Sequence, residues 1–161
     1  MAISLRLLEY NWNGTAYAAG ATLTFTPGPK SVSKSVDVQW RVMHRGRRKL
    51  KKAKFRVRET TTWTIAGSCQ GSYTESLLRN TIEFYAKRNS KFKVIIDENT
   101  PQIFLTPGSG PNTYEIVFVV FKNVKFTQTE GKIGWFDYTI DLERVNCENM
   151  SGYSDPWTCT V

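Results

Sequence analysis

One segment of the chain has the period of an α-helix, and the apolar residues on both sides of it alternate with the period of a β-strand. The helix is predicted at residues 73–88, where Ser72 and Glu75 have the spacing of a capping box that marks its start. Its apolar face is formed by Leu77, Leu78, Ile82 and Tyr85. Because a helix of about four turns is marginal alone in water, this one must pack on a sheet.

Strand patterns cover much of the remaining sequence. The predicted strands are residues 2–10, 21–26, 36–42, 52–58, 63–66, 92–96, 102–106, 114–126 and 133–145. The strand at 63–66 is expected to end at Gly67, before a polar turn at 68–71. The strand at 114–126 is the longest, and its run of apolar residues at both parities predicts cover on both faces. The predicted fold is mainly β: a β-sandwich or partly closed barrel of about eight or nine strands, with one flanking α-helix and a long basic hairpin.

The length of 161 residues suits a single domain with a sizeable core. We expect one β-sandwich domain with its helix at residues 1–146, followed by a C-terminal extension at residues 147–161. The longest apolar run, Ile116 to Phe121, is far too short for a membrane span, and the first residues do not resemble a signal peptide. The sequence therefore predicts a soluble protein that is made in the cytoplasm.

The positive charge of the chain is concentrated in one segment. The formal net charge is +8, but ten Lys or Arg and no acidic residue lie between Arg41 and Arg58. The rest of the chain carries 12 basic and 14 acidic residues, which is slightly acidic. Because the strands at 36–42 and 52–58 each alternate apolar and polar residues, the segment is predicted to form a hairpin with one apolar and one basic face.

This basic hairpin has three interpretations, which the residues alone leave open. It could bind nucleic acid through phosphate contacts, with Trp40, His44 and Phe55 nearby for stacking. It could dock on an acidic surface of another subunit, such as the strand face carrying Asp137, Asp141 and Glu143, or it could be solvated and protect an edge strand. The candidate contact residues are Arg45, Arg47, Arg48, Lys49, Lys51, Lys52, Lys54, Arg56 and Arg58.

Catalytic and metal-binding patterns are not found in the sequence. The single histidine, His44, excludes the usual triads and makes a zinc site improbable by ligand count. Cys69 is predicted in the turn before the helix, while Cys147 and Cys159 could close a loop that a reducing cytosol would oppose. We therefore predict no catalytic residues, no metal, no cofactor and no enzymatic activity.

The order of strand, glycine, turn, helix and strands, ending in the sequence GWFDYTIDLERV from Gly134 to Val145, resembles the β-sandwich domain of tail proteins from tailed viruses. That family includes tail-tube, distal-tail and baseplate proteins and is related in fold to the tube proteins of contractile injection systems. The resemblance covers about Val36 to Val145 and is one of pattern.

The resemblance implies a structural virion protein of a tail tube or baseplate. Family members form hexameric rings that join their sheets around a channel for DNA and stack on one another. A long hairpin at the place of Met43–Lys52 commonly reaches the adjacent ring. The implied partners are copies of the same chain and other tail or baseplate proteins, with DNA only as cargo and no membrane. Because a strongly cationic lumen would hold DNA, we expect the hairpin at a ring–ring contact or on the outer surface. The alternative function is a basic β-domain that binds nucleic acid through the 41–58 hairpin.

Overall fold

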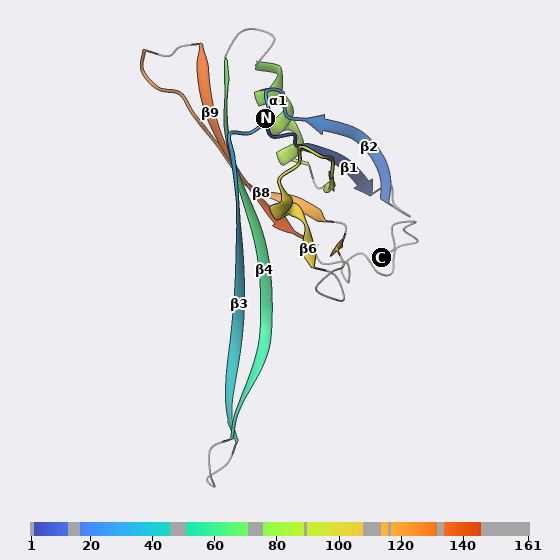
Figure 1. Ribbon diagram of the computed structural model, residues 1–161, viewed down its shortest axis with the longest axis vertical. Helices are drawn as coiled ribbons and strands as arrows, with labels where there is room; N and C mark the ends of the chain where they lie inside the picture. The colour runs from blue at the N-terminus through green and yellow to red at the C-terminus, as the bar shows by residue number, and fades with distance from the viewer. Residues whose placement is uncertain are drawn as a thin grey trace.

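The computed structural model describes residues 2–12, 17–45, 51–70, 76–88, 90–107, 114–115, 117–131 and 134–145. Within them, nine strands, one α-helix and one short 3-10 helix follow one another along the chain (Figure 1). These elements are β1 (Arg6–Trp12), β2 (Tyr17–Thr24), β3 (Ser31–Arg45), β4 (Lys51–Gln70), α1 (Ser76–Ala86), β5 (Lys91–Ile95), η1 (Gln102–Phe104), β6 (Thr106–Pro107), β7 (Tyr114–Glu115), β8 (Phe118–Thr127) and β9 (Trp135–Arg144). The mainly β class with a single α-helix, predicted from the sequence, is confirmed. No helix among the described residues is long and apolar enough to cross a membrane.

Seven of the strands form one antiparallel sheet in the order β2-β1-β5-β8-β9-β4-β3, and β6 pairs with β7 separately. Among the described strands, β2 and β3 each pair on one side only, so they are the two edges of an open sheet. Both edges come from the first half of the chain, whereas the strands between them come mostly from the second half.

The seven-stranded sheet bends back on itself. In the sheet order, β2 and β9 are separated by three strands, and a flat sheet would place them about 19 Å apart at about 4.8 Å per spacing. The ring of Phe25, which follows β2 directly, nevertheless lies with its centroid 6.1 Å from that of Tyr138 on β9. The fold is therefore a partly closed, sandwich-like arrangement, as predicted.

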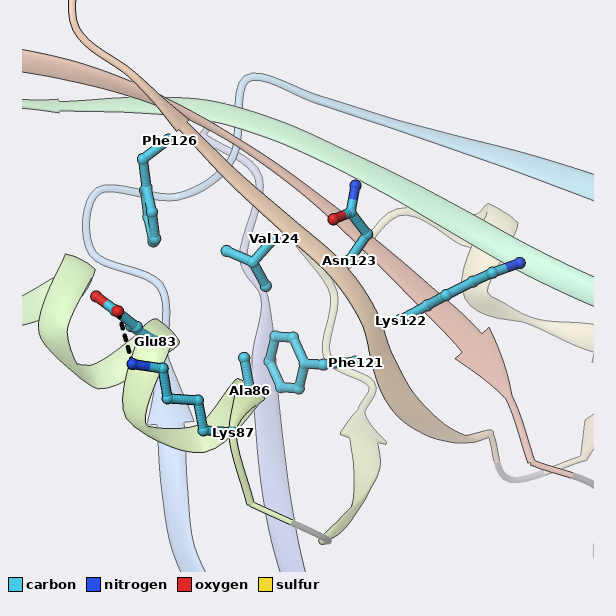
Figure 2. Close-up of a pocket in the computed structure, with 8 residues that line it drawn as sticks. All are labelled: Glu83, Ala86, Lys87, Phe121, Lys122, Asn123, Val124 and Phe126. Atoms are coloured by element: carbon cyan, nitrogen blue, oxygen red, sulfur yellow. Dashed lines mark hydrogen bonds and ion pairs between the residues drawn. The ribbon is translucent and has the colours of Figure 1, made fainter.

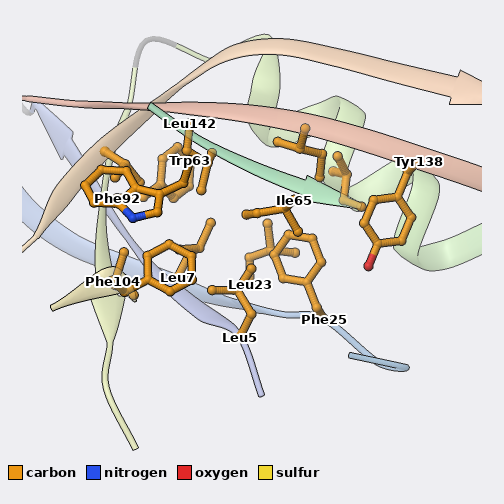
Figure 3. Packing of buried hydrophobic residues seen from close by; sticks show 14 of the residues in the cluster. Leu5, Leu7, Leu23, Phe25, Trp63, Ile65, Phe92, Phe104, Tyr138 and Leu142 are labelled. Atoms are coloured by element: carbon orange, nitrogen blue, oxygen red, sulfur yellow. The ribbon is translucent and has the colours of Figure 1, made fainter. Parts of the chain in front are cut away.

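The hydrophobic core fills the space inside this bend. Side chains of β1 and β2, such as Leu7 and Leu23, meet those of β4 and β9, such as Ile65 and Leu142 (Figure 3). Trp63 is fully buried there; its ring stacks on Phe104 of η1 at 5.7 Å, and its indole Nε1 donates a 2.9 Å hydrogen bond to the Ile103 carbonyl. The β9 prediction is confirmed, because its inward residues Phe136, Tyr138, Ile140 and Leu142 are all buried. Each such side chain contributes about 1.5–3 kcal/mol through burial.

Helix α1 covers the outer part of this core, as its apolar face predicts. Ile82 is fully buried, and the Tyr85 ring meets Phe92 edge-on at 5.9 Å, which in turn meets Phe121 of β8 at 5.0 Å. The polar positions Arg79, Asn80, Glu83 and Lys87 are exposed. The proposed capping box lies outside the described residues, as do the side chains of Leu77 and Leu78.

The prediction of a strand ending at Gly67 is wrong. Strand β4 continues through Gly67 to Gln70, so Ser68 and Cys69 lie in a strand and not in a turn. The glycine has a packing role instead. It pairs with Tyr138 of β9, whose ring occupies the space where a Cβ at position 67 would stand.

Two other strand predictions also need correction. Residues 102–104 form the 3-10 helix η1, and of the predicted strand 102–106 only Thr106 lies in a strand, the short β6. The segment 114–126 is divided into β7 and β8, and the longest strand is β4 with 20 residues. The prediction of cover on both faces is confirmed, since Phe118 packs in a small cluster with Tyr10 while Val119 lies in the main core.

Candidate assembly surfaces

The hairpin formed by β3 and β4 extends far beyond the sheet to which it belongs. Strand β9 pairs with β4 only from Thr62 to Gln70, so the part of β4 from Lys51 to Thr61 pairs with β3 alone. In Figure 1 this two-stranded ribbon projects away from the body of the molecule. It spans Val36–Arg45 of β3, a length of about 30 Å at the rise of a β-strand. A two-stranded ribbon of this kind is marginally stable by itself in water.

The register of the ribbon differs from the predicted amphipathic hairpin. A bulge interrupts the pairing where Gln39 pairs with Arg58 and Trp40 pairs with Arg56, which leaves Val57 as the extra residue of β4. Beyond the bulge every partner is shifted by one residue, so Val42 pairs with Lys54 and not with an apolar residue. The prediction of one apolar face shared by both strands is therefore wrong.

The base of the ribbon exposes apolar side chains. Val36 and Trp40 are 52% and 49% exposed, although each belongs to the apolar parity of β3. Closer to the body, the Lys34 ammonium lies 5.6 Å from the centroid of the buried Trp63 ring. Partial burial, together with the nearby charge of Arg144, lowers the pKa of Lys34. Val36 and Trp40 thus form an exposed apolar surface where the ribbon leaves the core.

The predicted contact residues lie along this ribbon. Six of them are placed in its strands, namely Arg45, Lys51, Lys52, Lys54, Arg56 and Arg58, whose side chains are not described. Arg47, Arg48 and Lys49 lie outside the described residues. The register sets Arg45 opposite Lys51 and His44 opposite Lys52. Arg45 and Lys51 carry like charges, and like charges at opposite positions disfavour pairing.

The acidic strand face suggested as a docking surface is already used in part within the chain. On β9, the Asp141 carboxylate accepts a 2.7 Å hydrogen bond from the Thr64 hydroxyl, and Glu143 forms a 3.4 Å ion pair with Lys122. The side chain of Asp137 is exposed and makes no hydrogen bond or ion pair to another described residue. Of the three acidic residues, only Asp137 is therefore open to a partner.

A hollow of about 500 Å³ surrounds this aspartate at the start of β9. Its walls come from the β8–β9 connection, the end of β4 and the residue before β3, and they include Thr129, Ser68 and Lys30. Trp135 also lines the hollow and is 46% exposed. The sequence analysis did not single out Trp135. The available signal was its parity, since it shares the outward positions of β9 with Asp137 and is apolar.

A second hollow, of about 310 Å³, lies between α1 and β8 (Figure 2). Phe121, Val124 and Phe126 form its apolar side. Three charged residues line it, and all are in ion pairs: Glu83 with Lys87 at 2.9 Å, and Lys122 with Glu143. The described residues of this groove therefore offer no uncompensated charge to a charged partner.

The free edge at β2 has few of the features that protect a sheet edge from pairing. The strand carries no charged residue and no proline, and its exposed stretch is Ala18-Ala19-Gly20-Ala21. Its one protective feature is a bulge, where the register with β1 shifts between Leu8 and Tyr10. Edges of this composition readily accept another strand. The β3 edge carries Lys34 and Asp37 and is more polar.

No group of three His, Cys, Asp or Glu residues in the described part of the chain is placed to hold a metal ion. Cys69 is a buried cysteine of β4 that forms no disulfide, and its neighbour Tyr138 has a raised pKa because burial disfavours the phenolate. Cys147 and Cys159 lie outside the described residues. The candidate sites that the described residues form are therefore surfaces for assembly.

Neither a protein-family model nor a curated protein matches the chain. Several solved structures are similar to it, among them two at 12% sequence identity each. One is described as the virion of a native gene transfer agent (GTA) particle, with a TM-score of 0.45, covering 87% of this chain and 91% of that one. The other is the tail of an empty GTA particle with C6 symmetry, with a TM-score of 0.44 and the same coverage of both chains.

Proposed function

We propose that this protein is a structural subunit of a viral tail, in a tail tube or baseplate, and that it acts by assembly without chemical turnover. In this proposal six copies form a ring around a channel through which DNA passes as cargo. Rings stack on one another and on other tail or baseplate proteins. The mature location is the virion, after synthesis in the host cytoplasm.

The observation that carries the proposal is the open sheet with two free edges, one of which continues into the projecting ribbon. A sheet with the unguarded β2 edge on one side and the β3 edge on the other can join to a copy of itself. Because the two edges differ, the contact is head-to-tail, and such contacts close into rings when the rotation between copies allows it.

The ribbon supplies a different kind of contact. It leaves the sheet plane of its own subunit as a two-stranded element with exposed Val36 and Trp40 at its base. An element of this kind gains stability when another molecule packs on it. Its length of about 30 Å is enough to reach a neighbouring ring.

A second function is favoured by one specific observation, the dense positive charge of the ribbon beside the exposed ring of Trp40. Cations that contact phosphates, together with an aromatic ring on which bases stack, are the features of sequence-tolerant nucleic-acid binding. The logarithm of the binding constant for nucleic acid would fall linearly with the logarithm of the salt concentration. Ring formation through sheet edges would depend on salt only slightly.

Ring formation can be tested at the β2 edge. We expect the double variant Ala18→Lys and Ala21→Lys to remain folded but to lose rings, because two lysines on an edge strand block a further strand. Sedimentation velocity and negative-stain microscopy of purified protein measure the assembly, and thermal melts check the fold.

The matched control adds the same charge at exposed positions away from both edges, with Asn80→Lys and Asn123→Lys. This double variant should assemble as the wild-type protein does. A wild-type protein that remains monomeric at all concentrations, or rings that survive the edge lysines, would contradict the proposal.

A further inference from the structure

We infer that the hollow at the start of β9, lined by Trp135 and Asp137, is the receptor for the basic β3–β4 hairpin of a second copy of this chain. The inference rests on the proposed function, since it assigns the site at which one ring meets the next. It also makes the contact between copies directional, with the hairpin at one end and its receptor at the other.

The two features lie at opposite ends of the molecule. Strand β4 begins at Lys51 in the basic hairpin and ends at Gln70, and its residue Ser68 lines the hollow beside its β9 partner Asp137. Its 20 residues extend over about 60 Å at the rise of a β-strand. Figure 1 shows the start of β9 at the far end of the molecule from the hairpin. A hairpin therefore cannot reach the hollow of its own subunit and must enter that of another copy.

The chemistry of the hollow suits a cationic side chain. Asp137 is exposed and has no ion pair with another described residue, so it can accept an Arg or Lys. The half-exposed ring of Trp135, two residues earlier on the same strand, offers a face for a cation–π contact. The hairpin has the largest excess of such cations in the chain, with ten Lys or Arg and no acidic residue between Arg41 and Arg58.

The hollow also has room for the side chains of an incoming turn. Its volume of about 500 Å³ lies in the range of sites that hold one small ligand, and a few side chains occupy a similar space. Gly131 and Gly134 line it, and a Cβ added at either position would meet no other atom within 4 Å.

Among the described residues that line the hollow, Lys30 is the basic one. Its side chain is exposed, and its backbone amide donates to the Ala66 carbonyl at 2.8 Å, so only the backbone of Lys30 is needed for the fold. In the proposed contact its charge opposes the hairpin and weakens the association. Removing this charge should therefore strengthen the contact, whereas removing the other side chains of the hollow should weaken it.

The test compares stacking of full-length variants by sedimentation velocity at low salt, with negative-stain microscopy to distinguish single rings from stacks. Asp137→Asn and Trp135→Ala should each weaken stacking about two- to five-fold per contact, with larger effects when contacts repeat around a ring. Lys30→Gln should strengthen stacking by a similar factor. Thr139→Ala, at an exposed outward position of the same strand, is the control and should change nothing.

A charge reversal identifies the partner. Asp137→Arg should abolish stacking, as should the triple change of Arg47, Arg48 and Lys49 to Glu. Combining both in one chain should restore stacks, because the signs at both ends are then exchanged. Failure of this rescue, or normal stacking of Asp137→Asn, would overturn the inference.

These outcomes separate the inference from the proposed function. If single rings form but the hollow variants stack normally while the hairpin variant does not, the receptor lies elsewhere and the tail function stands. If the hairpin variant loses only binding to DNA and stacks normally, the hairpin has a nucleic-acid partner and the inference is wrong. If the wild-type protein forms neither rings nor stacks, both proposals are wrong.

Discussion

Gly67 and Tyr138 are partners across β4 and β9, and they show how one residue can hold an aromatic ring inside the bent sheet. The ring of Tyr138 lies directly over the glycine, and its hydroxyl is buried without a hydrogen-bond partner among the described residues. Burial raises the pKa of this phenol, and the nearby Cys69 adds to the effect, so the group stays neutral. An unpaired buried hydroxyl opposes folding, which the packing of the ring must offset.

We expect Gly67→Ala to lower the free energy of unfolding by about 1–3 kcal/mol, because the new methyl group would overlap the Tyr138 ring and force it to move. Thermal melts would show this as a decrease of roughly 2–4 °C in Tm per kcal/mol. Gly134→Ala is the matched control, since a Cβ there meets no atom within 4 Å. Equal melting temperatures for wild type and Gly67→Ala would mean that the ring does not pack as described.

Single residues also explain why part of the candidate site was missed from the sequence. The apolar residues Trp40 and Trp135 are both about half exposed. Trp40 was placed on the apolar face of the predicted hairpin, and its exposure follows because β4 pairs with β3 alone at this point. Trp135 has the outward parity and was not singled out. Parity predicts which side a residue faces, and only the tertiary fold determines whether that side is covered.

At the level of elements, the predictions succeeded where a pattern was both regular and covered by the core. Helix α1 and strand β9 have unbroken periods of 3.6 and 2 residues, and both are found: the inward residues of β9 are buried, and on α1 Ile82 is buried and Tyr85 partly buried. The prediction failed for the register of the hairpin, because the bulge between Gln39 and Trp40 has no signal in the sequence. One extra residue shifts every later pair, and neither strand reveals it alone.

We expect Ile82→Ala in α1 to destabilise the protein by about 2–4 kcal/mol, because it removes a fully buried aliphatic side chain from the contact between helix and sheet. Denaturant unfolding measures the change, and Asn80→Ala on the exposed side of the same helix is the control. The control should be within about 0.5 kcal/mol of wild type. A similar, small effect for both variants would mean that the helix does not pack on the sheet.

In the whole molecule, the positive charge is concentrated in the part that projects from the body. The body is slightly acidic, and the excess of positive charge lies in a ribbon that projects from it (Figure 1). Each exposed ion pair contributes only about 0–1 kcal/mol, so a single contact between two copies would be weak. Contacts repeated around a ring add together, which makes stacking cooperative while the subunit itself remains independent of the ribbon.

We therefore expect replacement of Arg47, Arg48, Lys49, Lys51 and Lys52 by Ser or Gln to leave the Tm of the subunit nearly unchanged, because the core lies outside the ribbon. The same variant should form rings but should not stack them into tubes. In the wild-type protein stacking should weaken as salt rises, since screening shortens the range of exposed charges to about 8 Å at physiological ionic strength. Sedimentation and electron microscopy at low and high salt measure both effects. If the neutral variant forms normal tubes but loses DNA binding, the hairpin contacts nucleic acid and not the neighbouring ring.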